Sequence, residues 1–307
     1  MQSNIQEIKE LIVTTSCSGK CESCERYFDC NLPRKETFKQ KGILTFIQRN
    51  LEHIKHKVAI LGGKGGVGKS MLAVNLAVGL SKRGKKVCIV DQSYDCPAIP
   101  MMMGIPQDYR LRYEDGFIPA ETKYGPKVIS TGLILDPDEI IIWFSEMKRN
   151  ATEEILACTK FGELDYLVFD IPTGTSAETI NVLKYLPDLD GGIVVTVPSS
   201  VSQNVARKCI YVLRKAGIPV IGVVENMSDT YCPKCGKLLN IISKDAGRIM
   251  SEQEGCNFLG KIPLLKEMSK SLDEGHPFVD KYPDHEVTKT LMNIADAVIS
   301  FCEKEKR

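Results

Sequence analysis

A glycine-rich segment contains the residue types that bind the phosphates of a nucleotide. The pattern G-x-x-x-x-G-K-S/T is matched by Gly63, Lys64, Gly65, Gly66, Val67, Gly68, Lys69 and Ser70. Glycines let backbone N–H groups approach a phosphate closely, and a helix beginning at the loop adds partial positive charge. In this motif Lys69 contacts the β- and γ-phosphates, and the Ser70 hydroxyl binds Mg²⁺. The segment therefore predicts a nucleotide site with Mg²⁺.

Two aspartates are expected to lie beside this loop. Asp91 follows the apolar run 87–90, and Asp170 follows the apolar run 166–169. Both runs are expected to be strands of one parallel sheet, whose strands end at the same edge as the loop. From that edge a carboxylate reaches the shell of the magnesium ion.

Twelve cysteines provide a second kind of chemistry, because clustered thiols in a reducing compartment indicate metal rather than disulfides. Cys17, Cys21, Cys24 and Cys30 bring four thiolates into a short N-terminal segment. Four thiolates suit either zinc or a 4Fe–4S cluster, and the spacing does not separate the two.

The pair Cys232 and Cys235, in Cys-Pro-Lys-Cys, provides only half of a ligand set. A symmetric dimer would complete it, with one metal centre on the two-fold axis. In a competing arrangement, Cys21 and Cys24 join Cys232 and Cys235 around one zinc ion.

The elements that must position these residues form an α/β pattern. Strands are expected at 58–61, 87–90, 127–131, 166–169, 192–197, 220–224 and 258–262, with helices at 69–83, 201–216 and 286–302. Such alternation predicts a doubly wound, mainly parallel sheet. We divide the chain into an irregular cysteine-rich arm over 1–35, a helical connector over 36–55, and a P-loop domain over 56–307 that includes the Cys232–Cys235 site.

Composition narrows the function classes. The chain has 307 residues, of which 43% are hydrophobic, and its 40 Lys and Arg against 39 Asp and Glu leave a net charge of +1. Balanced charge predicts no nucleic-acid partner. No apolar run is long enough to span a membrane, and the polar N-terminus is unlike a signal peptide. We therefore expect a cytoplasmic protein without a membrane partner.

The loop resembles that of the deviant Walker-A ATPases, the group that includes the MinD, ParA and ArsA families, because Lys64 is a second lysine within it. In that group this lysine reaches across a dimer to the partner's nucleotide. The resemblance implies a nucleotide-sandwich homodimer and adds Lys64 to Lys69, Asp91 and Asp170 as a catalytic residue.

Further motifs are similar to one branch of this group, the Mrp/ApbC-type ATPases and the cytosolic nucleotide-binding iron–sulfur scaffold proteins. They are Ile54-Lys55-His56-Lys57, Pro97-x-Ile99-Pro100, Asp170-x-Pro172-x-Gly174-Thr175, Val224-Glu225-Asn226-Met227-Ser228 and Leu259-Gly260-Lys261-Ile262-Pro263-Leu264. The resemblance implies a homodimer that binds ATP, assembles 4Fe–4S clusters and transfers them to apoproteins. One labile cluster would bridge the two Cys232/Cys235 pairs, a firmer one would sit on the arm, and Asn226 would contact the base.

Departures from the branch affect hydrolysis. Ser93 stands where a second acid is frequent, Cys96 replaces a glycine, and Glu178 comes one place late. We therefore expect a slow ATPase. Asn226 and Asp229 also fit the N-x-x-D spacing of guanine readers, but the usual lysine is missing, so we favour ATP. The alternatives are a zinc or nickel metallochaperone, which only the bound metal separates from our interpretation, and a MinD/ParA-type positioning ATPase.

Overall fold

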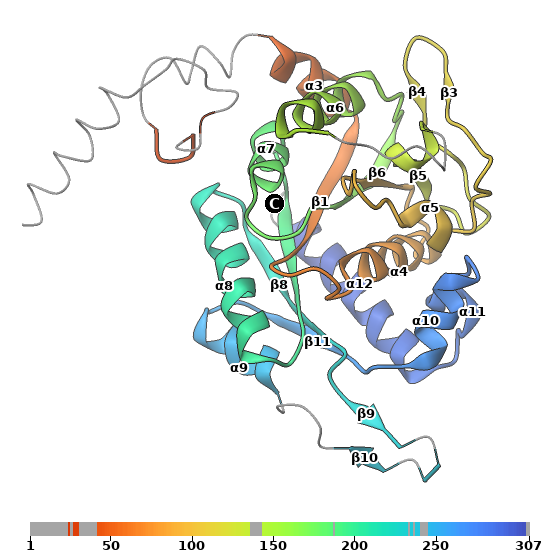
Figure 1. Cartoon of the computed structure of the whole chain (residues 1–307), viewed down its shortest axis with the longest axis vertical. Helices are drawn as coiled ribbons and strands as arrows, with labels where there is room; N and C mark the ends of the chain where they lie inside the picture. Colours follow the sequence, from red (N-terminus) through yellow and green to blue (C-terminus); the bar gives the residue numbers. More distant parts are fainter. Residues whose placement is uncertain are drawn as a thin grey trace, which may run out of the picture.

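A seven-stranded parallel sheet forms the centre of the chain, with helices on both faces (Figure 1). This arrangement comes from a computed structural model, which describes residues 24, 27–30, 42–135, 143–186, 188–232, 234–235, 237–239 and 245–304. The strand order is β11-β8-β7-β1-β6-β2-β5, and every neighbouring pair is parallel. The predicted doubly wound sheet is confirmed, and each segment expected to be a strand belongs to it. The strands are β1 Ile54–Gly62, β2 Val87–Asp91, β5 Lys127–Ser130, β6 Leu164–Asp170, β7 Gly191–Thr196, β8 Val220–Asn226 and β11 Phe258–Ile262.

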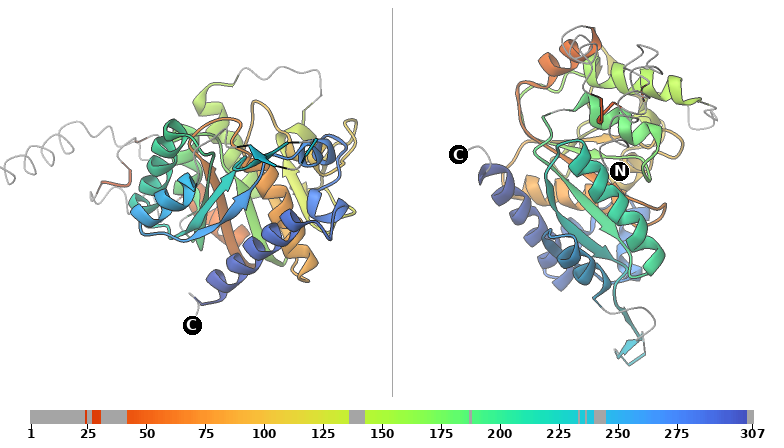
Figure 2. Two further views of the ribbon diagram at one scale, coloured as in Figure 1. Left: turned by 90° about the horizontal axis from the view of Figure 1, so that it is seen from below. Right: turned by 90° about the vertical axis from the view of Figure 1, so that its left-hand side faces the viewer.

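Two layers of helices enclose this sheet, as the two views of Figure 2 show. One face is covered by α4 Lys69–Lys82, α5 Ile99–Met102, α10 Lys266–Asp273, α11 Phe278–Lys281 and α12 Glu286–Lys304. The other is covered by α3 Ile43–Leu51, α6 Ser145–Cys158, α7 Ala177–Tyr185, α8 Ser200–Lys215 and α9 Ala246–Gln253.

The strands supply both cores because successive side chains on a strand point to opposite faces. In β1, Val58 and Ile60 pack toward α4 and α12, whereas Ala59 and Leu61 pack toward α8 and the rest of the second layer. A strand buried on both sides must be apolar throughout. This requirement explains the continuous apolar runs in the sequence.

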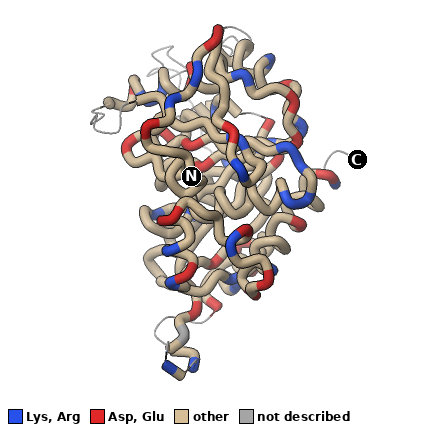
Figure 3. Tube along the Cα trace, turned by 90° about the vertical axis from the view of Figure 1, so that its right-hand side faces the viewer, with Lys and Arg blue, Asp and Glu red and all other residues tan. Residues whose placement is uncertain are grey.

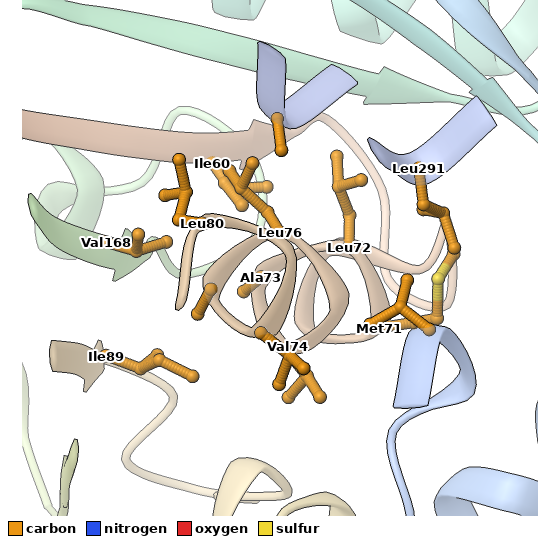
Figure 4. Packing of buried hydrophobic residues seen from close by; sticks show 14 of the residues in the cluster. Ile60, Met71, Leu72, Ala73, Val74, Leu76, Leu80, Ile89, Val168 and Leu291 are labelled. Atoms are coloured by element: carbon orange, nitrogen blue, oxygen red, sulfur yellow. The ribbon is translucent and has the colours of Figure 1, made fainter. Parts of the chain in front are cut away.

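Helix α4, which begins at the nucleotide loop, is deeply buried. It lies between the sheet and α12, so apolar side chains surround it on several sides (Figure 4). Leu72, Leu76 and Leu80 are fully buried, and each such side chain contributes about 2 kcal/mol. This packing fixes the first turn of α4, which carries the two loop residues expected to contact phosphate and Mg²⁺.

Smaller elements differ from the sequence expectations. Two hairpins, β3 Arg112–Tyr113 with β4 Phe117–Ile118 and β9 Thr230–Tyr231 with β10 Leu238–Leu239, had no predicted counterpart, and η2 Thr131–Leu133 follows β5. In the connector predicted over 36–55, α3 is the described helix, and β1 already begins at Ile54, because the sheet recruits that apolar residue. Along the trace in Figure 3, Lys and Arg positions are interspersed with Asp and Glu positions. Among the described helices, none combines the length and apolarity needed to cross a bilayer.

Candidate nucleotide and metal sites

The phosphate-loop motif lies between β1 and α4, the strand–loop–helix context that it requires. Gly68 precedes the helix with a φ of +94°, and a Cβ at this position would overlap the side-chain amide of Asn226. Only glycine combines a left-handed backbone with this close approach. Gly63 is similarly crowded, because a Cβ there would lie 2.6 Å from the backbone of Val205 in α8.

Lys69 is buried in the first turn of α4, and its Nζ donates a hydrogen bond to the Thr173 hydroxyl over 3.1 Å. Burial lowers the pKa of the Lys69 ammonium, and the Asp170 carboxylate partly offsets this effect. Thr173 belongs to the segment between β6 and α7, whose Gly174 N–H donates to the carbonyl of Gly62. The ammonium is thus held at the loop, and Thr173 is the partner that a bound phosphate would replace.

Asp170 ends β6 directly beside the loop. One of its carboxylate oxygens accepts a hydrogen bond from the Ser70 hydroxyl at 2.5 Å. Within the part of the chain that the structure describes, its other oxygen, Oδ1, is buried and has no hydrogen-bond partner. Burial raises the pKa of Asp170 to about 6, although the Ser70 hydrogen bond and Lys69 act in the opposite direction. A hydroxyl and an under-used carboxylate side by side fit the oxygen ligands that Mg²⁺ prefers.

Asp91 ends β2 in register with Asp170, so the two carboxylates stand on neighbouring strands. Its oxygens accept hydrogen bonds from the Ser93 N–H at 2.9 Å and the Ser130 hydroxyl at 3.0 Å. Burial and the neighbouring Asp170 raise the pKa of Asp91 to about 7. The sequence predicted that both acids would lie near the loop, and the register of β2 and β6 brings them together.

Ser93, Cys96 and Glu178, the departures from the family pattern that led us to expect slow hydrolysis, lie around this edge of the sheet. Ser93 supplies the N–H that binds Asp91, and Cys96 is exposed. Glu178 lies in the first turn of α7, 3.8 Å from the Lys148 ammonium. Lys64, in the loop, is exposed.

Asn226 ends β8 and is buried beneath the loop, where its Nδ2 donates a hydrogen bond to the carbonyl of Val67 over 2.9 Å. The sequence offered no signal for this contact, which joins residues from distant parts of the chain. The predicted contact of Asn226 with the base stays a prediction. Beyond it, Met227 has a positive φ of 52°, and the N–H of Ser228 donates to the carbonyl of Ile262.

Cys232 and Cys235 lie on the β9–β10 hairpin, which projects from the body after β8 (Figure 1). Cys235 is exposed and Cys232 is half-buried. The N–H of Cys232 donates to the carbonyl of Lys237, closing the hairpin. Hydrogen bonds from the backbone of Cys235 and Lys234, and from the Cys235 side chain, hold the pKa of the Cys232 thiol below its usual range. The two thiols therefore converge and are accessible to a partner.

The structure describes two of the four N-terminal cysteines. Cys17 and Cys21 lie outside the described residues, as does most of the arm, while Cys24 and Cys30 are half-buried. Between them, Tyr27 is buried with the Lys184 ammonium 5.1 Å from its ring, and Asp29 forms an ion pair with Lys215. Lys184 and Lys215 are in α7 and α8.

This contact creates a cavity of about 400 Å³, lined among others by Cys24, Asp29, Thr175, Asn181 and Tyr211. In Figure 1 and in the right-hand view of Figure 2, the described arm residues lie toward the end of the molecule opposite to the β9–β10 hairpin. Within a single chain in this conformation, Cys24 is therefore too remote to share one zinc ion with the hairpin cysteines.

The chain matches the family described as "ParA: NUBPL iron-transfer P-loop NTPase" over residues 53–299. It is 37% identical over 285 residues to the iron-sulfur cluster carrier protein of Methanocaldococcus jannaschii, covering 92% of this chain and 97% of that protein. It is 36% identical over 256 residues to the cytosolic Fe-S cluster assembly factor NUBP2 of Bos taurus, covering 82% and 94% respectively.

Solved structures agree with the fold. A nucleotide-binding protein from Archaeoglobus fulgidus, described in complex with ADP and with Co, aligns with a TM-score of 0.69 at 28% identity, covering 80% of this chain and 96% of that one. The cell division ATPase MinD of Pyrococcus furiosus aligns with a TM-score of 0.60 at 23% identity, covering 80% and 99%. The predicted MinD/ParA-like architecture is confirmed.

Proposed function

Because the chain belongs to the NUBPL iron-transfer P-loop NTPase family, we propose that it is an ATP-dependent scaffold or carrier that binds iron–sulfur clusters and transfers them to apoproteins. The observation that carries this proposal is the accessible Cys232/Cys235 pair on a hairpin that follows the buried nucleotide-site strand β8. A carrier must present its cargo to a recipient, and on this projecting hairpin Cys235 is exposed and Cys232 is half-buried.

The cargo is a 4Fe–4S cluster held between two copies of the chain. Each hairpin supplies two thiolates, and a cluster of this type takes four. A two-fold axis through the cluster lets identical hairpins complete the set. Lys64 supports the same dimer, because its exposed side chain lies on the loop and can reach a nucleotide in a partner.

The nucleotide is ATP with Mg²⁺. Lys69 and the loop N–H groups bind the phosphates, and Ser70 with Asp170 holds the cation; the buried Oδ1 of Asp170 supports this role. Bound Mg²⁺ supplies charge neutralisation for the phosphates. Asp91 accepts hydrogen bonds from the Ser93 N–H and the Ser130 hydroxyl, and it thereby orients the residues at this edge of the site. With Ser93 in place of a second acid, we expect slow hydrolysis.

The site couples nucleotide to cargo through β8. Asn226 is bonded to the carbonyl of Val67 in the loop, and the chain runs from Asn226 to Cys232 within one short segment. When phosphate binding shifts the loop carbonyl, the end of β8 and the base of the hairpin shift with it. Linkage then requires that cargo binding alter ATP affinity by the same factor.

The N-terminal arm, over 1–35, carries a second metal centre formed by Cys17, Cys21, Cys24 and Cys30. Its metal is a 4Fe–4S cluster in our proposal, with zinc as the alternative outcome of metal analysis. The arm folds with metal, because its composition provides no core of its own. The relatives named as cytosolic support a location in the cytosol.

The cargo site is tested by anaerobic purification and iron, sulfide, zinc and nickel analysis. The background is the full chain with Cys24→Ala and Cys30→Ala, so that the arm contributes no cluster. In this background Cys232→Ala with Cys235→Ala should lose the remaining iron and sulfide and keep ATP binding, whereas Cys96→Ser, at another exposed cysteine, should keep both. Unchanged iron without Cys232 and Cys235 would overturn the assignment, and stoichiometric nickel or zinc would favour a metallochaperone.

A further inference from the structure

Three potential metal ligands meet at the edge of the sheet opposite the nucleotide site. His56 lies near the start of β1, Asp190 immediately precedes β7, and Cys302 is in the last turns of α12. One ligand atom from each side chain lies within 4.8 Å of the other two. Parallel strands start at one edge and end at the other, so this cluster is separate from the loop and from the hairpin cysteines, which follow the end of β8.

Hydrogen bonds hold Asp190 and His56 in place. Oδ1 of Asp190 is 3.0 Å from Nδ1 of His56, while Oδ2 accepts a hydrogen bond from the N–H of Lys57 at 2.7 Å. The N–H of Asp190 in turn donates to the carbonyl of Lys57. This reciprocal pairing clamps the start of β7 to β1. A carboxylate oriented by the backbone is the support that metal ligands commonly have.

The cluster is buried, and beside it lies a fourth polar group, the Tyr166 hydroxyl. Cys302 is fully buried and His56 is 8% exposed. Tyr166 pairs with His56 across β1 and β6, with the ring centroids 5.0 Å apart. Its hydroxyl is buried and makes no hydrogen bond within the described part of the chain. A buried hydroxyl without a hydrogen-bond partner lowers the stability of the fold by about 1–3 kcal/mol.

Negative groups dominate the surroundings of this hydroxyl. Burial raises the pKa of Tyr166, and Cys302, Glu303, Asp190 and Asp165 raise it further. The hydroxyl therefore senses the same thiol and carboxyl groups that form the cluster. Two of these acids already have cationic partners: Glu303 is paired with Lys85, and Asp165 with Lys55.

We propose that His56, Asp190 and Cys302 form a binding site for a single divalent transition-metal ion, with Zn²⁺ as the best match. An imidazole, a carboxylate and a thiol are the nitrogen, oxygen and sulfur ligands that zinc accepts, usually in a tetrahedron. The Tyr166 hydroxyl or a water molecule takes the fourth position. On binding, the Cys302 thiol releases its proton to solvent and the sulfur coordinates as thiolate.

Such an ion joins three segments that are far apart in the sequence. It would fasten the end of α12 to the start of β1, the strand that leads into the nucleotide loop, and to β7. We assign the ion a structural role, because its ligands join three elements of the fold. The site is independent of the proposed cluster-carrier function.

The test uses Co²⁺ and Zn²⁺ as probes on the full chain. In a background with all six cluster cysteines changed to alanine (Cys17, Cys21, Cys24, Cys30, Cys232, Cys235), folding is checked by circular dichroism. Anaerobic Co²⁺ titration should then give one ion per chain with a thiolate-to-cobalt charge-transfer band. Zn²⁺ should displace the cobalt and raise the melting temperature.

Adding Cys302→Ser should abolish the charge-transfer band, and His56→Gln should weaken Zn²⁺ binding by at least about tenfold. Cys256→Ser, at a half-buried cysteine outside the cluster, is the matched control and should change neither. Absence of stoichiometric Co²⁺ in the folded background would overturn the proposal. So would a band of full intensity after Cys302→Ser. If Cys302→Ser does not fold, His56→Gln decides: unchanged Zn²⁺ affinity refutes the site.

Discussion

Replacing Asp91 by asparagine should make the nucleotide-free chain more stable at neutral pH. Burial and Asp170 raise the pKa of Asp91 to about 7, well above its unfolded value. Between these two pKa values the folded state keeps a proton that the unfolded state has released, so stability falls as pH rises. Asparagine has no such proton. Its amide can still accept from the Ser93 N–H and donate to the Ser130 hydroxyl, so the local geometry is preserved.

The size of the effect follows from the pKa. From about pH 5 to about pH 7 the parent should lose up to about 3 kcal/mol relative to Asp91→Asn, at about 1.4 kcal/mol per pH unit. Urea denaturation in EDTA, followed by circular dichroism at several pH values, measures this difference. Above about pH 8 the advantage of the variant should stay constant, because Asp91 is then ionised in both states.

Asp165→Asn provides the control on β6, the strand paired with β2. Hydrogen bonds from Lys55 and from the backbone of Lys86 hold the pKa of Asp165 below its usual range. That carboxylate therefore stabilises the fold above its unfolded pKa, and its loss should destabilise the chain at neutral pH. If the advantage of Asp91→Asn is the same at about pH 5 and about pH 8, or is larger at the lower pH, the reasoning about the buried pair is wrong.

Lys69→Ala should lose ATP binding. Lys64→Ala should still bind ATP but fail to form the nucleotide-dependent dimer, which gel filtration with a non-hydrolysable analogue measures. A dimer equal to the parent's would contradict the role of Lys64. Gly68→Ala should lower the free energy of unfolding by at least about 1–2 kcal/mol, because the left-handed φ disfavours alanine and the new Cβ meets Asn226. Urea denaturation measures this loss of stability. An unchanged free energy of unfolding would show that the loop tolerates a side chain at this position. Cluster transfer to a model apoprotein should differ between nucleotide-free and ATP-bound protein, and the difference should shrink in Asn226→Ala; equal rates in all conditions would remove the proposed coupling. Tyr27→Ala should speed proteolysis of the N-terminal arm, because the contact with α7 is lost; unchanged cleavage would count against docking of the arm.

Local patterns in the sequence determined the class of fold and the nucleotide loop. The apolar runs that became β1, β2 and β6 are buried on both faces, and such runs are visible without knowing their neighbours. The loop from Gly63 to Ser70 is likewise contiguous, so its residue types and spacing alone predict phosphate binding. The acids Asp91 and Asp170 were identified because each follows a strand, and parallel strands end together.

Only the tertiary structure decided which distant residues meet. The bond from Asn226 to Val67, the contact of Lys69 with Thr173, and the cluster of His56 with Cys302 depend on strand order and register, which hydrophobic periodicity does not encode. The β9–β10 hairpin was missed because its strands are two residues long and have no core face of their own. The same limit applies to the cysteines: spacing grouped Cys24 with Cys30, but only the packing on α7 and α8 placed them far from Cys232. Sequence patterns report which face of an element is buried, whereas contacts between elements are decided by how the crossover connections stack them.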